Sequence, residues 1–321
     1  MQAAVVRRYG APEVVEIVDQ PTPEPKRGEV LVRVEAVAVT AADGRLRAGR
    51  FPRGFGVVAK LGFGISGPRK HVLGIAYSGV IERVGEGVTG FAPGDEVAGM
   101  NGKTLGMHAQ VAAVPVDRVA LKPAGLSHAD AAGVLFGGTT ALYFLRDRAE
   151  VRPGQTVLVN GGSGAVGSAA VQLARHFGAT VTAVTSAANA NLIRRIGAES
   201  VIDYSVTPVA ELAALGQSYD VVFDAVGNVD RGLGLSLSRP GGTLVLAVAD
   251  LVDTVRARER VVAGGAPERP ADFTELMRLV VEGHLDPLTR SLGSLDALIE
   301  AHRIVDSGHK VGNIVVLPNA Q

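Results

Sequence analysis

The stretch 157–167 combines residue types that suit the binding of a phosphorylated ligand. It reads Val-Leu-Val-Asn-Gly-Gly-Ser-Gly-Ala-Val-Gly, so three glycines have G-x-G-x-x-G spacing directly after an apolar run. Gly162 permits a sharp turn, Gly164 lets the backbone approach a pyrophosphate, and Gly167 lets the next helix pack close to the strand. The unpaired N–H groups and the dipole of that helix attract phosphate. We therefore predict a dinucleotide-binding turn made by Gly162, Ser163, Gly164, Ala165, Val166 and Gly167.

The surroundings of this turn strengthen the prediction. A G-x-G-x-x-G pattern alone is weak evidence in a chain with 41 glycines among its 321 residues. Here a helical run follows the glycines, and a second strand-like run, 179–184, follows at the distance that a βαβ unit requires. This context favours dinucleotide binding over a purely structural glycine turn.

The residues after this second strand indicate which dinucleotide is bound. An acidic side chain at that position would hydrogen-bond the adenosine 2′-OH and repel a 2′-phosphate. The chain has no acid between 184 and 189 but carries Thr185, Ser186 and Asn189, whose hydroxyl and amide groups can donate to a phosphate. NADPH is therefore favoured over NADH. The alternative is that these three residues only cap a helix.

The composition argues against several other classes of protein. The 32 Lys and Arg residues balance 32 Asp and Glu residues, so nucleic acid is not an expected partner. The chain has no cysteine, which excludes disulfides, thiolate nucleophiles and Cys-ligated zinc. The uncharged run 153–174 has a polar centre, Asn160 to Gly164, and is therefore not expected to span a membrane. The N-terminus lacks the order of a signal peptide, so we expect a cytoplasmic protein.

The pattern of strands and helices predicts two domains. Residues 1–122 are rich in predicted strands, and 48–70 has no periodicity, which predicts a mobile loop near a site. From about 123 the pattern changes: Ser127 caps a helix, and apolar strands then alternate with helices, which predicts a doubly wound parallel sheet. The strands are expected at 1–6, 13–18, 29–37, 79–85, 95–99, 156–160, 180–184, 200–203, 220–224, 243–248, 260–264 and 312–317, and later helices at 270–282 and 295–306.

Several phrases, in this order along the chain, resemble the zinc-free, quinone oxidoreductase-like branch of the medium-chain dehydrogenase/reductase superfamily. Besides the glycine turn they are Val72-Leu73-Gly74, the runs 78–85, 91–97 and 138–142, Gly-Ala-Glu-Ser-Val-Ile-Asp-Tyr at 197–204, and Ser-Gly-His-Lys-Val-Gly at 307–312. The resemblance covers almost the whole chain. It implies a GroES-like β-barrel catalytic domain (1–122), a Rossmann domain (123–283) and a C-terminal return to the catalytic domain (284–321), with the active cleft between them.

The resemblance also implies that the enzyme works without zinc. Where zinc-dependent members have Gly-His-Glu, this chain has Gly74-Ile75-Ala76, so no metal ligand is expected. Many zinc-free relatives keep a carboxylate at the third of these positions, and Ala76 departs from that pattern.

Further cofactor contacts follow from the resemblance. Thr140 would reach the diphosphate or the nicotinamide, and the phenol of Tyr204 would join the 2′-phosphate. Val226 and Gly227 would pass the ribose, and Ala247 and Val248 would line the nicotinamide pocket. Lys310 would approach from the C-terminal tail, unless it is an ordinary solvated lysine. A homodimer through the edge strand 260–264 is also implied.

Without a metal, the expected reaction is hydride transfer to a substrate that becomes a delocalised anion. Quinones and α,β-unsaturated carbonyls yield a phenolate or enolate that needs only one or two hydrogen-bond donors. Thr40 stands where relatives have Asn and is a candidate donor, unless it only packs at a strand end. Tyr77 is a second candidate, unless it is a half-buried aromatic, whereas Asp43 is expected to fix its loop. We therefore interpret the chain as an NADPH-dependent reductase of quinones or α,β-unsaturated carbonyl compounds. One alternative is an enoyl or tailoring reductase of a biosynthetic pathway. The other is a non-catalytic NADPH sensor or structural protein.

Overall fold

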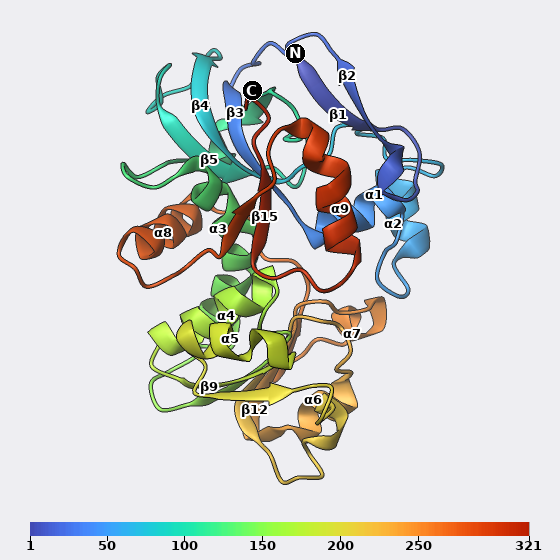
Figure 1. Cartoon of the computed structure of the whole chain (residues 1–321), viewed down its shortest axis with the longest axis vertical. Helices are drawn as coiled ribbons and strands as arrows, with labels where there is room; N and C mark the ends of the chain where they lie inside the picture. Colours follow the sequence, from blue (N-terminus) through green and yellow to red (C-terminus); the bar gives the residue numbers. More distant parts are fainter. Residues whose placement is uncertain (321) are drawn as a thin grey trace.

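The computed structural model describes residues 1–320, and its strands form one large sheet in each half of the molecule (Figure 1). The upper half in that view holds a seven-stranded sheet in the order β14-β15-β3-β4-β5-β7, with β6 paired to β3. A separate antiparallel pair, β1 (Gln2–Val6) and β2 (Val15–Asp19), lies beside it. The strands of the large sheet are β3 (Glu29–Val39), β4 (Ala76–Val84), β5 (Glu96–Met100), β6 (Val111–Pro115), β7 (Val119–Leu121), β14 (Thr289–Ser291) and β15 (Asn313–Val316).

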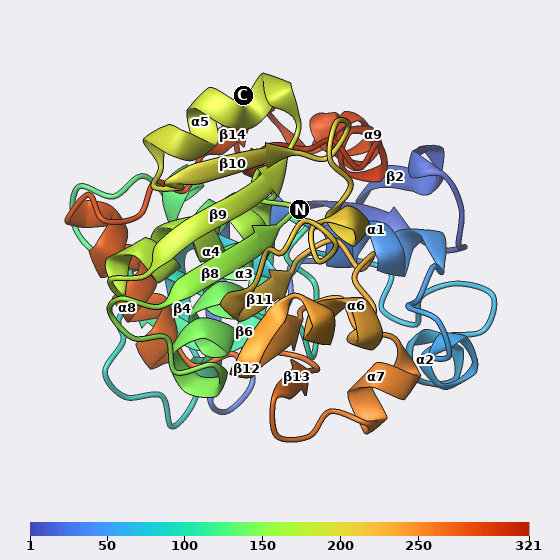
Figure 2. The ribbon, with the colours of Figure 1, turned by 90° about the horizontal axis from the view of Figure 1, so that it is seen from below.

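The lower half holds a six-stranded parallel sheet in the order β10-β9-β8-β11-β12-β13 (Figure 2). The order reverses beside β8, which is where doubly wound sheets bind their ligands, at the carboxyl ends of the strands. Residues 157–159 of β8 are fully buried because helices cover both faces of the sheet. The strands are β8 (Thr156–Asn160), β9 (Thr180–Thr185), β10 (Ser200–Asp203), β11 (Tyr219–Asp224), β12 (Ser238–Leu246) and β13 (Val261–Ala263).

Helix α3 (His128–Leu142) connects the two halves. Its N-cap is Ser127, whose side chain accepts a hydrogen bond from the N–H of Asp130, as predicted. The helix packs on β3, β4 and β15 of the upper sheet, on α4 of the lower half and on α8 (Pro270–Val281). A π-helical stretch, Tyr143–Arg148, continues it. Helix α8 lies beside the upper sheet and contacts β5 and β7 (Figure 1). The helices of the lower half are α4 (Ala165–His176), α5 (Ala190–Arg195), α6 (Arg231–Ser236) and α7 (Leu251–Val255).

The C-terminal segment returns to the upper sheet. Strand β15 lies between β14 and β3, pairing antiparallel with β3. Helix α9 (Leu298–Asp306) precedes it and packs against α1 (Ala41–Ala48) (Figure 1). The predicted helix over 295–306 and the predicted strand over 312–317 are therefore both present.

The segment 48–70, predicted to be a mobile loop near a site, is helical in its middle, and residues 50–52 do line the cavity described below. Helix α1 is begun by Thr40, which forms a capping box with Asp43, and it ends at Gly49, whose φ of 64° is left-handed. A second helix, α2 (Gly56–Phe63), follows. None of its residues is buried, so it lacks the apolar stripe by which a helix is recognised in a sequence. Strands β6, β7 and β14 were also not predicted.

Candidate active site

A cavity of about 1170 Å³ lies between the two halves of the molecule. One wall is the carboxyl edge of the parallel sheet, including the nucleotide turn and the residues that follow β9, β11 and β12. The other wall consists of α1, residues 50–52 and the tail 305–311. The cavity therefore lies at the switch point of the sheet order, as a dinucleotide site would.

The nucleotide turn has the geometry that its glycines predict. Gly164 is the N-cap of α4 and offers no side chain to that helix, so the first N–H groups have no capping side chain. A Cβ at Gly167 would lie 2.0 Å from the carbonyl oxygen of Gly161, so only glycine lets α4 pack this closely. Ser163 and Gly164 line the cavity, whereas Gly162, Ala165, Val166 and Gly167 form the frame behind them.

A buried carboxylate shapes the turn after β11. Asp224 accepts hydrogen bonds from the N–H groups of Val226 (3.0 Å) and Gly227 (2.9 Å) and from Nδ2 of Asn160 (2.8 Å). Burial raises the pKa of Asp224. The same Asn160 amide donates to Asn228, and both asparagines line the cavity beside Val226. The sequence analysis missed both asparagines, although a polar residue at the end of β8 was a usable signal.

The residues predicted for the adenosine end of the cofactor are brought together. Thr185, Ser186, Asn189 and Tyr204 all line the cavity, and no acidic side chain lies among its lining residues on this wall. The Thr185 hydroxyl is buried and has no hydrogen-bond partner among residues 1–320. This end of the cavity thus presents hydroxyl and amide groups, one of them unsatisfied.

Lys310 lines the cavity from the tail and is not an ordinary solvated lysine. Its ammonium group donates to the carbonyl of Gly312 and forms no ion pair within the described chain. Burial lowers the pKa of Lys310 to about 8. The tail itself touches the nucleotide turn, since the N–H of Gly312 donates to the carbonyl of Ser163 at 2.9 Å.

Three of the remaining predicted cofactor residues do not line the cavity. Val248 lines the cavity, but Gly227 and Ala247 lie outside its lining. Thr140 also lies outside, and its hydroxyl donates to the carbonyl of Phe136 in its own helix at 2.9 Å. A role for Thr140 at the cofactor stays a prediction.

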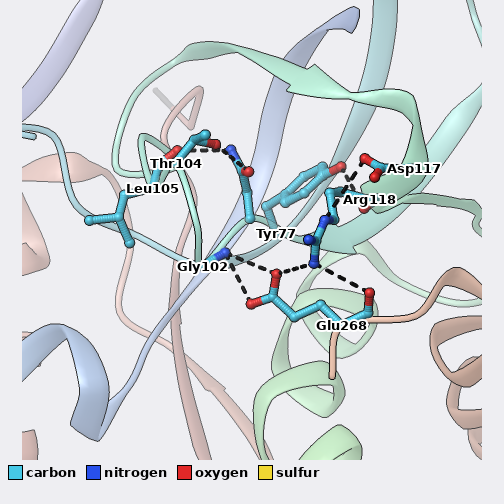
Figure 3. A network of polar contacts seen from close by, with 8 residues as sticks. Tyr77, Gly102, Thr104, Leu105, Asp117, Arg118 and Glu268 are labelled. Atoms are coloured by element: carbon cyan, nitrogen blue, oxygen red, sulfur yellow. Dashed lines mark hydrogen bonds and ion pairs between the residues drawn. The ribbon is translucent and has the colours of Figure 1, made fainter. Parts of the chain in front are cut away.

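Neither predicted catalytic donor faces the cavity. Thr40 is buried, and its hydroxyl donates to Asp43 Oδ2 at 2.6 Å. Asp43 also accepts from the N–H groups of Thr40 (2.8 Å) and Gly74 (3.1 Å), so it fixes the loop as expected. Tyr77 is fully buried on β4, with its hydroxyl 3.5 Å from the carbonyl of Arg118 (Figure 3). Burial raises the pKa of Tyr77, and its placement as a cleft residue was wrong.

The upper wall instead offers two arginines that the sequence analysis did not select. Arg45 on α1 and Arg50 just after it line the cavity together with Phe51 and Pro52. Arg50 was missed because 48–70 was predicted to be a loop, and Arg45 because the helix over 41–48 was not predicted. A run of arginines beside a predicted site was the available signal.

Within residues 1–320, no cluster of three or more His, Asp or Glu side chains could bind a metal ion. No helix in that range combines the length and apolar character needed to cross a bilayer. These two observations concern only the described part of the chain.

Comparison with known proteins agrees with this architecture. Residues 26–144 match the alcohol dehydrogenase GroES-like domain, and residues 196–316 match the zinc-binding dehydrogenase family. The NADPH-dependent alkenal/one oxidoreductase of Arabidopsis thaliana is 31% identical over 99% of this chain and 80% of its own length. The 2-haloacrylate reductase of a Burkholderia species is 30% identical over the full length of both chains.

A solved structure is similar throughout. The quinone oxidoreductase from Coxiella burnetii superposes with a TM-score of 0.87 at 29% identity and covers 99% of both chains. The upper half of the molecule is thus a GroES-like domain and the lower half a Rossmann domain. The chain belongs to the quinone oxidoreductase-like family of the medium-chain dehydrogenase/reductase superfamily.

Proposed function

We propose that the protein is an NADPH-dependent oxidoreductase that transfers hydride to a quinone or to the activated double bond of an α,β-unsaturated carbonyl compound. The observation that carries the proposal is the cavity at the switch point of the parallel sheet, which joins the nucleotide turn to a wall of the GroES-like domain. The names of the relatives, an alkenal/one oxidoreductase, a 2-haloacrylate reductase and a quinone oxidoreductase, support the same class of reaction.

The side chains around the cavity fit NADPH. The half-buried ammonium of Lys310 lacks a carboxylate partner in residues 1–320, and α4 has no capping side chain; a diphosphate would satisfy both. Ser186, Asn189 and Tyr204, with the unsatisfied Thr185 hydroxyl, would hold the 2′-phosphate. Val226 and Gly227 would pass the ribose, and Val248 would border the nicotinamide, with the backbone of Ala247 behind it.

NADPH, when bound, would supply a hydride from C4 of its nicotinamide. The electron pair of the hydride would form the new bond to the substrate, and the π electrons that it displaces would end on the substrate oxygen. The residues of the chain position the substrate and exclude water from the cavity. Because the product anion is delocalised over a ring or an enolate, few donors are needed, and solvent completes the protonation. This small need for donors agrees with the structure, in which neither Thr40 nor Tyr77 can donate a hydrogen bond into the cavity.

The test is to follow NADPH absorbance with a panel of quinones, enones and enoyl thioesters. We expect turnover with quinones or enones and weaker binding of NADH than of NADPH. Turnover confined to enoyl thioesters would assign a tailoring reductase of a biosynthetic pathway instead. Tight NADPH binding without turnover of any compound would assign a sensor or structural protein, and equal or tighter NADH binding would overturn the cofactor assignment.

We also propose a cytoplasmic homodimer that acts on a small molecule rather than on nucleic acid. Strand β13 is the last strand of the six-stranded sheet, so a second copy can pair with its outer edge. Light scattering after size-exclusion chromatography measures the mass, and a monomer at micromolar concentration would contradict the dimer. Cell fractionation tests the location.

A further inference from the structure

Helix α1 presents a defined face to the cavity. Ala41, Gly44 and Arg45 line it, and their i, i+3, i+4 spacing places them on one side of the helix. The other face is anchored: Asp43 is buried in the capping box, and Arg47 is fully buried. The position of Arg45 is therefore set by a helix that is fixed at its start and along its inner face.

The charge on this wall is unbalanced. Asp306 is the sole acidic residue among those lining the cavity, against Arg45, Arg50 and Lys310. Both of its oxygens are engaged, one by Arg47 at 2.5 Å and the other by Arg50 at 2.8 Å. Arg45 forms no ion pair with any side chain of residues 1–320. Burial, and then the charge of Arg50, lower the pKa of Arg45.

The segment that follows Arg50 runs toward the end of the cavity proposed for the nicotinamide. The chain after Arg50 is tied to the residues that follow β12, because the N–H of Leu251 donates to the carbonyl of Arg53 at 2.9 Å. Strand β12 is three strands away from β9, whose end carries the proposed 2′-phosphate site. At about 4.8 Å per strand the two ends are roughly 14 Å apart. The segment that follows Arg50 therefore lies away from the proposed 2′-phosphate site.

We propose that Arg45, supported by Arg50, binds a carboxylate on the substrate, so that the enzyme prefers activated double bonds that carry an acidic group. This inference rests on the proposed function, since it names the substrate class of that site. A guanidinium binds a carboxylate through two parallel hydrogen bonds, which orient the substrate as well as attract it. The carboxylate also supplies the counter-charge that Arg45 lacks among the described side chains.

The test compares 6-oxo-4-heptenoate with its methyl ester, because two methylene groups separate the carboxyl group from the enone, so both present the same enone and only the first is charged. We expect the acid to have the lower KM in the unmodified enzyme. Arg45→Met should reduce kcat/KM for the acid by roughly ten- to a hundredfold, the effect of one charge-assisted contact, and leave the ester within about threefold. Arg45→Lys should recover part of the loss, since it keeps the charge but not the paired geometry.

Arg53→Met is the matched control, because Arg53 is exposed in the same segment but does not line the cavity. This variant should leave kcat/KM unchanged for both substrates. Equal KM values for the acid and the ester in the unmodified enzyme would overturn the proposal. Loss of NADPH affinity in Arg45→Met would overturn it too. If neither these compounds nor any quinone or enone of the panel is reduced, the proposed function fails. Calorimetric binding of the acid to the NADP⁺ complex, with and without Arg45→Met, then decides the anion site independently of turnover.

Discussion

Two glycines of the nucleotide turn have different neighbours, so substituting one should affect ligand binding and substituting the other should affect folding. A Cβ at Gly164 would meet only the carbonyl oxygen of Gly161, at 3.7 Å, so the position opens toward the cavity. At Gly167 the same oxygen would lie 2.0 Å away and cannot move without breaking the turn. The first glycine therefore leaves space for a ligand, and the second leaves space for the protein itself.

Gly164→Asp should fold normally and lose NADPH binding, because a carboxylate would occupy the space of the pyrophosphate and repel it. Gly167→Ala should instead lower the free energy of unfolding by about 2 kcal/mol through a backbone collision. Thermal melts and fluorescence titration with NADPH measure the two effects. A Gly164→Asp variant that folds and binds NADPH normally would show that the site is misplaced.

We expect Lys310 to make cofactor binding depend on pH. Burial lowers its pKa to about 8 from the ordinary lysine value of 10.5, so the folded chain releases this proton before the unfolded chain does. Stability from this group therefore rises with pH between about 8 and 10.5, because the unfolded state binds more protons there. The phosphates of NADPH favour the charged form, so affinity should fall as pH rises above about 8.

Lys310→Met should bind NADPH roughly tenfold or more weakly at neutral pH and should lose this decline above pH 8. Titrations at several pH values provide the measurement, with Lys103→Met as an exposed control outside the cavity. An unchanged slope in Lys310→Met would assign the pH dependence to another group.

At the scale of elements, the contacts at the start of α1 indicate that Thr40 caps the helix and does not donate to the substrate. Its hydroxyl is committed to Asp43 and to the N–H of Asp43 at 3.3 Å. Thr40→Val should therefore lower stability by about 1 kcal/mol, the usual value of an N-cap, and change kcat less than threefold. Thr40→Ser keeps the oxygen and should retain the stability. A large loss of kcat in Thr40→Val at unchanged stability would restore Thr40 as a donor to the substrate.

The same element shows what could be predicted from the sequence. The parallel sheet was predictable because its strands are short apolar runs between turn residues, and the nucleotide turn because its glycines have fixed spacing. Helix α1 was not, because Gly44 and Gly49 conceal an eight-residue helix that is specified by its capping box. Tyr77 was misplaced because alternation in β4 does not reveal which side of a curved sheet faces the cleft. The Arg45 wall depends on contacts between distant segments, which no local pattern contains.

At the scale of the whole molecule, a polar network whose residues do not line the cavity ties the segment between β13 and α8 to the GroES-like half (Figure 3). Glu268, just before α8, accepts hydrogen bonds from the N–H of Gly102 at 3.0 Å and from Arg118 at 2.8 Å. Arg118 also donates to the carbonyl of Glu268. Burial raises the pKa of Glu268, so its interactions must offset the cost of keeping the carboxylate charged.

Glu268→Ala should lower the free energy of unfolding by about 2 kcal/mol, because Arg118 and the N–H of Gly102 would lose their partner. Glu275→Ala, which breaks an exposed ion pair with Arg278, should cost about 0.5 kcal/mol or less. Calorimetric melting of both variants tests the difference. Equal melting temperatures would show that the network contributes nothing to holding the halves together.

The position of β15 has a consequence for biosynthesis. This strand inserts between β14 and β3, so the β3 edge at Val37–Val39 stays unpaired until residues 313–316 have left the ribosome. The Rossmann half contains all six of its strands between residues 156 and 263 and can form earlier during translation. The nascent GroES-like half must wait, with an apolar strand open to aggregation, so slow synthesis of the last hundred codons should increase its dependence on chaperones.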